Sequence, residues 1–364
     1  MALPAIDPAR YAEQLADKTA RFRAAFAAAG IALPAPEVFA SPPLHYRLRA
    51  EFRIWHHGGR LDYAMFDPDE PRTPVFIDDF PVAAQAICEL MPRLRDRLQA
   101  DAVLAEKLFQ VDFHTTLSGD TLICLIYHRP LDEAWEAAAT ALAAELGVQL
   151  IGRSRGQKRV IGRDWVLEEF ELDGRTLRYQ HVEGSFSQPN GEVNRKMLAW
   201  ARARAAGLGG DLLELYCGNG NFSIALAPLF GRVLATEVSK ASVRAAHYNL
   251  DANGTGNVAL VRMSSDEISD ALAGGRVYRR MAGIELADYR FSTLFVDPPR
   301  SGLDAPTRAL AAGFAHVLYI SCNPHSLLTD LVELHQTHYI QAAAVFDQFP
   351  YTAHLECGVL LARR

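Results

Sequence analysis

Five short apolar runs in the second half of the chain constrain its fold more than any other feature. A helix-sized segment separates each run from the next. The runs read DLLELYC (211–217), RVLATEV (232–238), NVALVRM (257–263), STLFVDPP (292–299) and HVLYISC (316–322). Near-continuous apolar strands that alternate with helices are typical of a doubly wound, mainly parallel α/β sheet with both faces covered. Two last runs, YIQAAAVFDQF and HLECGVLLARR, have too short a link for a crossover helix, which predicts a final antiparallel pair.

The first half of the chain has a different pattern and predicts a separate α+β unit. Helical and strand-like patterns follow one another there without βα alternation, at 8–29 (helix), 48–57 (strand), 82–99 (helix), 108–129 (hairpin) and 132–147 (helix). We therefore expect two domains, residues 1–182 and residues 183–364. The second is expected to hold a Rossmann-like sheet of seven strands.

Composition narrows the class of protein. The 364 residues include 49% hydrophobic and 22% charged side chains, which is ordinary for a globular chain. A formal net charge of −6 argues against a protein that coats nucleic acid non-specifically, yet permits a local basic face. Five cysteines without a CxxC pair predict neither a disulfide framework nor a closed metal site. With no apolar run long enough for a membrane and no secretory pattern, we expect a cytoplasmic protein.

The stretch ELYCGNGNFS (214–223) ends the first apolar run and opens a helix. Gly218 and Gly220 allow the backbone to approach a ligand closely, but Ser223 stands where a third glycine would complete a dinucleotide motif. A tight strand-to-helix turn without a ligand is the alternative. Glu237 ends the next run at the distance expected of a carboxylate that binds ribose hydroxyls, although exposed glutamates at strand ends are common.

Three further residues stand where apolar runs begin or end. Asp297 precedes two prolines in FVDPPRSGL, which favours a rigid loop beside a ligand over a simple stiff turn. Cys322 follows its run directly, whereas a structural cysteine would more often lie inside the strand. Glu356 lies in the last strand pair. Because strand ends of such a sheet converge on one crevice, this thiol and this carboxylate are expected to meet.

Together these stretches resemble the RNA uridine-5-methyltransferase family. The resemblance spans nearly the whole chain and is carried by FSQPN (186–190), LLELYCGNGNFS, ATEVSK, FVDPPRSGLD, YISCNP and FDQFPYTAHLECGVLL. It implies an enzyme that uses S-adenosylmethionine to methylate carbon 5 of the T-loop uridine in tRNA, with tmRNA as a further substrate. Related rRNA enzymes often carry a cysteine-bound iron–sulfur cluster and an extra β-barrel. The chain lacks the cysteines for one, so we expect no cluster, no other metal and a monomer.

The resemblance also implies roles for individual residues. Cys322 would be the nucleophile that adds to uracil C6, and Glu356 the base that removes the C5 proton. A helix that begins after Asn323 is expected to lower the pKa of the Cys322 thiol. Cofactor contacts would come from Gln188, Tyr216, Gly218, Gly220, Asn221, Glu237 and Asp297. Whether Asp297 instead holds the uracil edge stays open at this point.

Candidate RNA contacts lie in the first half of the chain. The run 151–163 contains five basic residues and no acid, which is typical of a phosphate-binding strip or of a solvated loop; its members are Arg153, Arg155, Lys158, Arg159 and Arg163. In EFRIWH, alternation places Arg53 and Trp55 on one polar face, which suits the splayed bases of loop RNA. Phe109 and His128 are further candidates, although strand aromatics are more often buried in a core.

Three other functions are alternatives for this chain. One is methylation of rRNA by a related enzyme. Another is dinucleotide-dependent oxidoreduction, against which stand the missing third glycine, the Asp-Pro-Pro loop and the final antiparallel pair. The last is a non-catalytic RNA-folding protein, which the joint presence of Cys322 and Glu356 disfavours.

Overall fold

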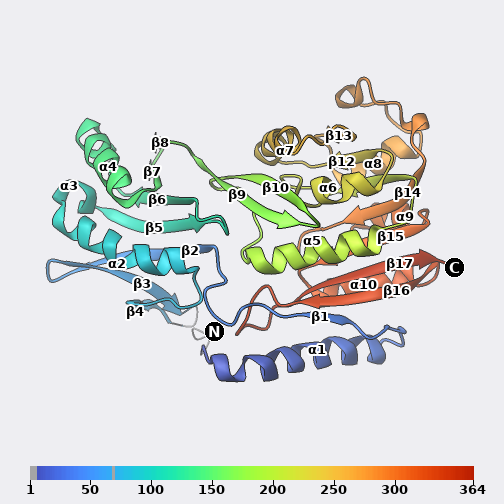
Figure 1. The fold of residues 1–364 in the computed structure, drawn as a ribbon, viewed down its shortest axis with the longest axis horizontal. Coiled ribbons are helices and arrows are strands. Elements are labelled where there is room, and N and C mark those ends of the chain that lie inside the picture. Colours follow the sequence, from blue (N-terminus) through green and yellow to red (C-terminus); the bar gives the residue numbers. More distant parts are fainter. Residues whose placement is uncertain (1–5, 68–69) are drawn as a thin grey trace.

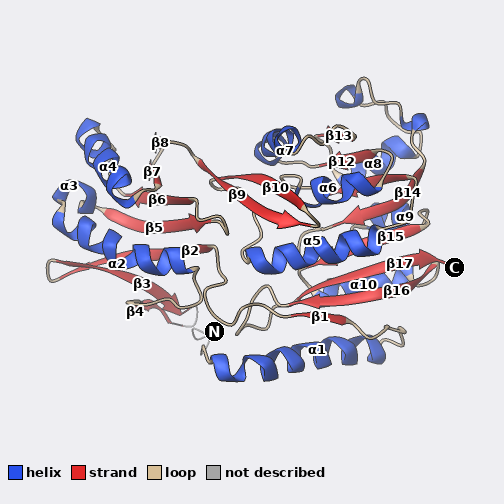
Figure 2. Ribbon diagram, viewed as in Figure 1, coloured by secondary structure: helices blue, strands red, loops and turns tan. Residues whose placement is uncertain are grey.

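The computed structural model of the chain describes residues 6–67 and 70–364, which form two large sheets side by side (Figure 1). A twisted hairpin of β9 (Trp165–Leu172) and β10 (Arg175–Val182) lies between them. Helices and strands alternate between residues 191 and 334, whereas the described part of the first half contains runs of consecutive strands (Figure 2). None of the helices in the described ranges is long and apolar enough to cross a membrane.

The described part of the N-terminal half forms a sheet of seven strands in the order β4-β3-β2-β5-β6-β7-β8. They are β2 (Arg49–His57), β3 (Arg60–Asp67), β4 (Glu70–Phe76), β5 (Leu108–Thr115), β6 (Thr121–Tyr127), β7 (Gln149–Ser154) and β8 (Gln157–Ile161). Phe52 and Ile54 of β2 are buried while Arg53 and Trp55 are exposed, as the alternation predicts. The buried face packs against α2 (Gln85–Ala100) and α4 (Glu133–Leu146), and α3 (Ala102–Ala105) lies between these helices in the chain.

The C-terminal sheet has, within the described ranges, eight strands in the order β1-β16-β17-β15-β14-β11-β12-β13. They are β1 (Glu37–Phe39), β11 (Asp211–Leu215), β12 (Val233–Thr236), β13 (Val258–Val261), β14 (Phe291–Val296), β15 (His316–Ser321), β16 (His338–Phe346) and β17 (Glu356–Arg363). The five parallel strands and the antiparallel pair of β16 and β17 are confirmed. The expected number of seven is wrong, because β1 adds an eighth strand parallel to β16. Three residues are too few to show a strand pattern in a sequence.

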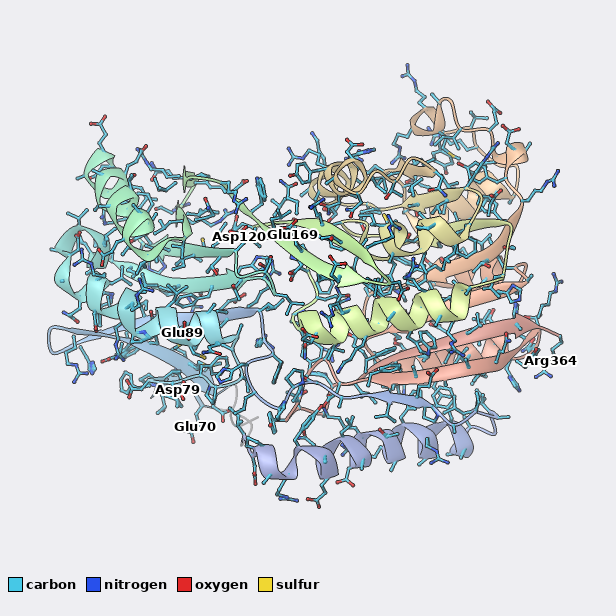
Figure 3. All side chains as sticks on the ribbon, in the orientation of Figure 1. Glu70, Asp79, Glu89, Asp120, Glu169 and Arg364 are labelled. Atoms are coloured by element: carbon cyan, nitrogen blue, oxygen red, sulfur yellow. The ribbon has the colours of Figure 1, made fainter. Side chains whose placement is uncertain are left out.

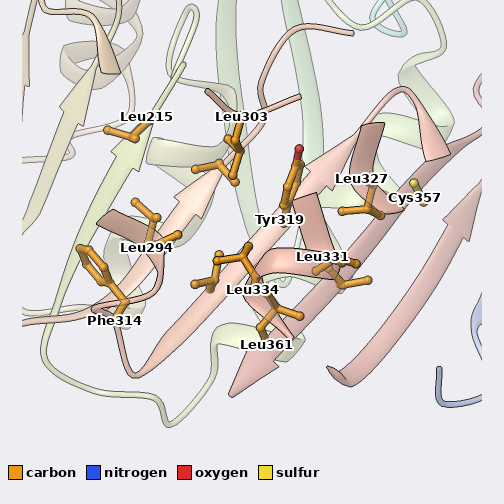
Figure 4. Packing of buried hydrophobic residues seen from close by; sticks show 14 of the residues in the cluster. Leu215, Leu294, Leu303, Phe314, Tyr319, Leu327, Leu331, Leu334, Cys357 and Leu361 are labelled. Carbon is orange, nitrogen blue, oxygen red and sulfur yellow. The ribbon is translucent and has the colours of Figure 1, made fainter. Parts of the chain in front are cut away.

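Helices cover both faces of this sheet. One face packs against α1 (Tyr11–Ala28), α8 (Ser265–Leu272), α9 (Ala305–Ala311) and α10 (Pro324–Leu334), and the other against α5 (Gly191–Ala205), α6 (Asn221–Leu226) and α7 (Lys240–Ala252). Figure 4 shows the first face, where Tyr319, Leu331 and Leu361 are in one buried cluster. Phe22 and Phe26 of α1 belong to the same cluster. Helix α1 therefore packs on the C-terminal sheet, and the predicted division into residues 1–182 and 183–364 stays a prediction.

The turn between β5 and β6 is bonded to β9. The Leu117 N–H donates to the Glu168 carboxylate at 3.0 Å, and the Leu167 N–H donates to Asp120 Oδ2 at 2.7 Å. Figure 3 labels Asp120 and Glu169 at this junction. The partner strand β10 is held against α7, where Asn249 Oδ1 accepts the Gln180 N–H at 2.6 Å. The hairpin thus fastens the N-terminal sheet to the C-terminal one.

Candidate active site

The three side chains expected to carry the chemistry lie at one edge of the C-terminal sheet. Asp297 directly follows β14, and Cys322 directly follows the neighbouring strand β15. Strand β17 runs antiparallel to β15 and pairs Cys357 with Ser321, so its first residue, Glu356, lies beside Cys322. Cys322 is half-buried, whereas Glu356 is only 5% exposed. This strand register therefore places the thiol and the carboxylate next to each other, as predicted.

Burial sets the charge of these groups. It raises the pKa of the Cys322 thiol to about 11, and the carboxylates of Glu356 and Asp297 add to the rise, while the Arg300 guanidinium opposes it. Burial also raises the pKa of Glu356 well above its usual value and that of Asp297 to about 7. The expected lowering of the thiol pKa is wrong. Helix α10 does begin right after the thiol, at Pro324, but burial is the largest influence on the thiol pKa, and two nearby acids raise it further.

Arg300, for which no role was expected from the sequence, connects the loop of the thiol with the loop of the carboxylate. Its carbonyl accepts a hydrogen bond from the side-chain amide of Asn323 at 2.9 Å, next to Cys322. Its guanidinium lies 3.1 Å from Nδ1 of His354, two residues before Glu356. A neutral His354 accepts this bond, because a guanidinium can only donate. The sequence could have indicated Arg300, because it stands directly after Asp-Pro-Pro.

The glycine loop is bent back on itself at the end of β11. Tyr216, Gly218 and Gly220 all have positive φ angles, of 61°, 57° and 83°. This region is unusual for a tyrosine and marks a backbone held by its surroundings. The Glu237 carboxylate accepts the Gly218 N–H at 3.0 Å and the Ser239 N–H at 2.7 Å. The predicted ribose-binding carboxylate thus lies against the glycine loop, as a nucleoside site requires.

Glu214 is a buried acid for which no role was predicted from the sequence. It lies on β11 and is 0% exposed, and its hydrogen-bonding neighbour is Ser223 of α6, which lowers its pKa without forming a bond of good geometry. Burial raises its pKa to about 8. A buried carboxyl group whose oxygens lack a well-formed hydrogen bond fits a ligand that carries a donor such as an amine. The sequence could have indicated Glu214, because it is an acid flanked by leucines within a strand.

Two other predicted cofactor residues have protein partners. The amides of Asn221 and Asn194 exchange two hydrogen bonds, of 2.9 and 3.1 Å. The Gln188 carbonyl oxygen accepts a bond of 3.1 Å from the side-chain amide of Gln348. In each pair the amide keeps free hydrogen-bonding capacity.

The basic run of residues 151–163 contains mostly paired charges. Arg153 bonds to Glu183 with Nε–Oε1 at 2.8 Å, and Lys158 bonds to Asp164 at 2.7 Å. Arg159 and Arg163 form ion pairs with Glu136 and Asp120. Arg155 is exposed and forms no ion pair with the described residues. Asp164 directly follows the run, but Glu183, Glu136 and Asp120 lie 23 to 43 residues from their partners, so a local pattern of charges could not show most of this neutralisation.

Arg53, Phe109 and His128 form a continuous stack on the polar side of the N-terminal sheet. The Arg53 guanidinium lies 3.9 Å from the centre of the Phe109 ring, and the rings of Phe109 and His128 are 4.0 Å apart and nearly parallel. The structure thus brings together three residues that the sequence offered as separate candidates. Such a stack presents flat surfaces of the kind that unpaired bases occupy.

The sheet order and its loops define the class of protein as an α/β enzyme of the methyltransferase fold. The crystal structure of Pyrococcus abyssi tRNA (uracil-54, C5)-methyltransferase, determined with S-adenosyl-L-homocysteine, matches 97% of this chain and 83% of its own at a TM-score of 0.74 and 19% identity.

A family model described as tRNA (Uracil-5-)-methyltransferase matches residues 10–364, and the chain belongs to this family. The tRNA/tmRNA (uracil-C(5))-methyltransferase of Aromatoleum aromaticum is 68% identical over 100% of this chain and 98% of its own. That of Dechloromonas aromatica is 64% identical over the full length of both.

Proposed function

We propose that the protein methylates carbon 5 of the T-loop uridine of tRNA, the nucleotide named as uracil 54 in the P. abyssi enzyme. Its close relatives are named for action on tRNA and tmRNA, so tmRNA is proposed as a second substrate. The observation that carries the proposal is the adjacency of Cys322 and Glu356 at the ligand-binding edge of the sheet. Membership of the family removes the dinucleotide-dependent oxidoreductase as an alternative.

The proposed chemistry needs one nucleophile and one base. The Cys322 thiolate adds to uracil C6, and the electrons of the C5=C6 bond make C5 nucleophilic. S-adenosylmethionine, when bound, supplies a methyl group to that carbon and leaves as neutral S-adenosylhomocysteine. Glu356 then takes the C5 proton, the C5–H electron pair restores the double bond, and the thiolate leaves.

The raised pKa values mean that Cys322 and Glu356 must each change protonation state when the substrate binds. Because the free protein favours a neutral Cys322, the thiol must lose its proton as uracil arrives. Glu356 must likewise be ionised before it acts as a base, so each of the two groups must lose a proton before its step. Arg300 is the cation that opposes both rises, so it favours the charged forms.

For the cofactor, we propose a site around the glycine loop. Gly218 and Gly220 allow close approach of the backbone, Tyr216 and Asn221 flank the loop, and Glu237 faces ribose hydroxyls. Gln188 and Asp297 complete the set, with the second role for Asp297 at the uracil edge retained. The buried carboxyl group of Glu214, whose oxygens lack a well-formed hydrogen bond, supports a ligand with a hydrogen-bond donor here.

For the RNA, we propose that the N-terminal sheet binds the T-arm. The stack of Arg53, Phe109 and His128 supports this more strongly than the basic run does, because most charges of that run are paired. Arg153, Arg155, Lys158 and Arg159 stay predicted contacts. A cytoplasmic monomer, expected from the sequence, also stays a prediction.

The first experiment maps the product. Bulk tRNA and rRNA that lack the modification are each incubated with enzyme and labelled S-adenosylmethionine, and the labelled nucleotide is located. We expect label only in 5-methyluridine of the T-loop. Label in rRNA but not in tRNA would favour the related rRNA activity instead.

The second experiment separates the two catalytic roles. Cys322→Ala should abolish both methylation and any covalent RNA adduct, because the other two thiols near this edge, Cys217 and Cys357, are buried. Glu356→Gln should still add to C6 and then stall, so that an adduct resistant to denaturation accumulates. Full activity of the first variant, or normal turnover of the second, would contradict the mechanism.

A further inference from the structure

A buried ion pair joins helix α1 to the segment that leads to Glu356. Lys18 Nζ lies 2.7 Å from Asp347 Oδ1, and the two side chains are 1% and 0% exposed. Lys18 also donates to the Phe349 carbonyl at 2.9 Å. Removing two charges from water is costly, and an apolar pair of the same volume often stabilises a fold as well or better. The ion pair therefore calls for an explanation other than stability.

Asp347 begins the link between β16 and β17, and this segment, residues 347–355, is fixed at several further points. The Tyr351 N–H donates to the side chain of Gln14 on α1 at 2.7 Å. The Tyr351 hydroxyl donates to the Pro43 carbonyl at 2.8 Å, and the Tyr46 hydroxyl donates to the Pro350 carbonyl at 3.2 Å. The first residue after the segment is Glu356. Residues from the first 46 positions of the chain thus hold the base at the far end of the sequence.

The same segment reaches the proposed cofactor site. Gln348, the neighbour of Asp347, is 1% exposed and donates its side-chain amide to Gln188 Oε1 at 3.1 Å. Fixing Asp347 therefore fixes both the approach to Glu356 and the partner of Gln188. A non-directional apolar contact at position 18 would hold the segment less specifically, because an ion pair with two hydrogen bonds accepts few geometries.

We propose that Lys18, through its buried ion pair with Asp347, is a positioning residue that holds segment 347–355 so that the Glu356 carboxylate reaches the C5 proton. This inference rests on the proposed function, since it needs Glu356 to act as the base. Small displacements of a catalytic group cost about 10- to 100-fold in rate. The step that suffers is proton removal, which comes after the covalent adduct has formed.

The test compares three variants with a matched control. Lys18→Met and Asp347→Asn each break the pair, and the double change Lys18→Met with Asp347→Leu removes both charges so that none is left buried. Arg10→Met breaks an ion pair with Glu13 whose side chains are 72% and 61% exposed, and serves as the control. Turnover, KM for tRNA, the covalent adduct at steady state and the thermal midpoint are measured for each.

We expect the single variants to lose about 10- to 100-fold in kcat with KM for tRNA unchanged and with more adduct than wild type. The double variant should melt at or above the wild-type temperature yet keep the slow turnover and the adduct. Arg10→Met should match wild type. If the single variants do not fold, the double variant alone decides.

Wild-type turnover in a stable double variant would overturn the inference, because the pair would then only support the fold. Glu356→Gln provides the reference for a trapped adduct. If that reference traps nothing, the proposed role of Glu356 as the base fails, whatever Lys18 does. If it traps the adduct while the Lys18 and Asp347 variants turn over normally, only the positioning role fails.

Discussion

At the scale of single residues, burial decides how the ionisable groups of this enzyme behave. Cys322, Glu356, Asp297 and Glu214 all lie at or near one end of the C-terminal sheet, and the pKa of each is raised chiefly by loss of water. A low-dielectric site that keeps acids neutral until the substrate arrives is typical of catalytic centres. This property follows from where the side chains lie and not from which residues they are.

The first consequence concerns the pH dependence of adduct formation. Glu356→Gln isolates the attack of Cys322, whose pKa of about 11 means that the thiolate fraction rises about tenfold per pH unit below that value. We expect the rate of adduct formation to rise continuously from pH 6 to pH 9. Denaturing gels of quenched single-turnover reactions measure it. A rate independent of pH would mean that bound RNA lowers the thiol pKa below 6.

The second consequence concerns stability. Glu214 has a pKa of about 8 in the folded protein against 4.5 in the unfolded chain, so between these values only the folded state holds the proton. Unfolding free energy therefore falls as pH rises from 4.5 to 8, by a few kcal/mol at most, roughly 1.4 per pKa unit. Glu214→Gln should lack this fall.

Urea unfolding of wild type and Glu214→Gln at pH 5 and pH 8.5 measures the difference. The unfolding free energy of the variant, relative to that of wild type, should be higher at pH 8.5 than at pH 5. The exposed Glu285→Gln is the control and should follow wild type throughout. An equal decline of all three proteins would show that Glu214 ionises freely in the fold.

At the scale of elements, the sheet edge that carries Glu356 depends on close packing by α5. A Cβ atom on Gly358 of β17 would lie 2.8 Å from the Trp200 ring and 3.0 Å from Ile320 Cδ1. The ring cannot withdraw, because Trp200 is 2% exposed and its Nε1–H donates to Glu37 at 2.8 Å. The absence of a side chain at Gly358 thus lets α5 approach the strand.

Gly358→Ala should therefore cost about 1–3 kcal/mol of unfolding free energy by overpacking. Gly256→Ala is a matched control, because no atom lies within 4 Å of its added Cβ and its φ lies outside the left-handed region. Chemical denaturation compares the two variants with wild type. Equal stability of both would mean that α5 shifts without cost.

The strands also show which elements a sequence pattern can predict and which it cannot. The five apolar runs and the final pair could be predicted because each is a contiguous stretch of mainly apolar side chains, and most have several consecutive buried residues, such as the fully buried β11. Strand β1 escaped notice because it has three residues, none of them buried. Its place in the sheet comes from backbone pairing with β16, which has no signature in side chains.

At the scale of the whole molecule, the proposed RNA surface and the catalytic edge belong to different sheets. The stack of Arg53, Phe109 and His128 is on the N-terminal sheet, while Cys322 is on the C-terminal one. The β9–β10 hairpin fastens one sheet to the other through Asp120 and Asn249. An RNA bound to both sheets would have its loop held by one and its target base by the other.

Phe109→Ala tests the RNA surface alone. Loss of base stacking should weaken tRNA binding by about 1–3 kcal/mol, while binding of S-adenosylhomocysteine stays unchanged. Tyr339→Ala removes a 44% exposed ring of β16 on the other sheet and should leave both affinities as in wild type. Filter binding and calorimetry measure them. Unaltered tRNA affinity in Phe109→Ala would remove the stack from the proposed surface.

The sequence by itself determined the mainly parallel sheet, the loops at its ligand-binding edge and the family, because these depend on long apolar runs and short contiguous motifs. Tertiary structure alone decided the rest. It turned the expected activation of Cys322 into a raised pKa, neutralised the basic run with distant acids, and placed α1 on the C-terminal sheet. The physical reason is that charge state and packing depend on neighbours in space, and Lys18 and Asp347 are 329 residues apart in the chain yet 2.7 Å apart in the fold.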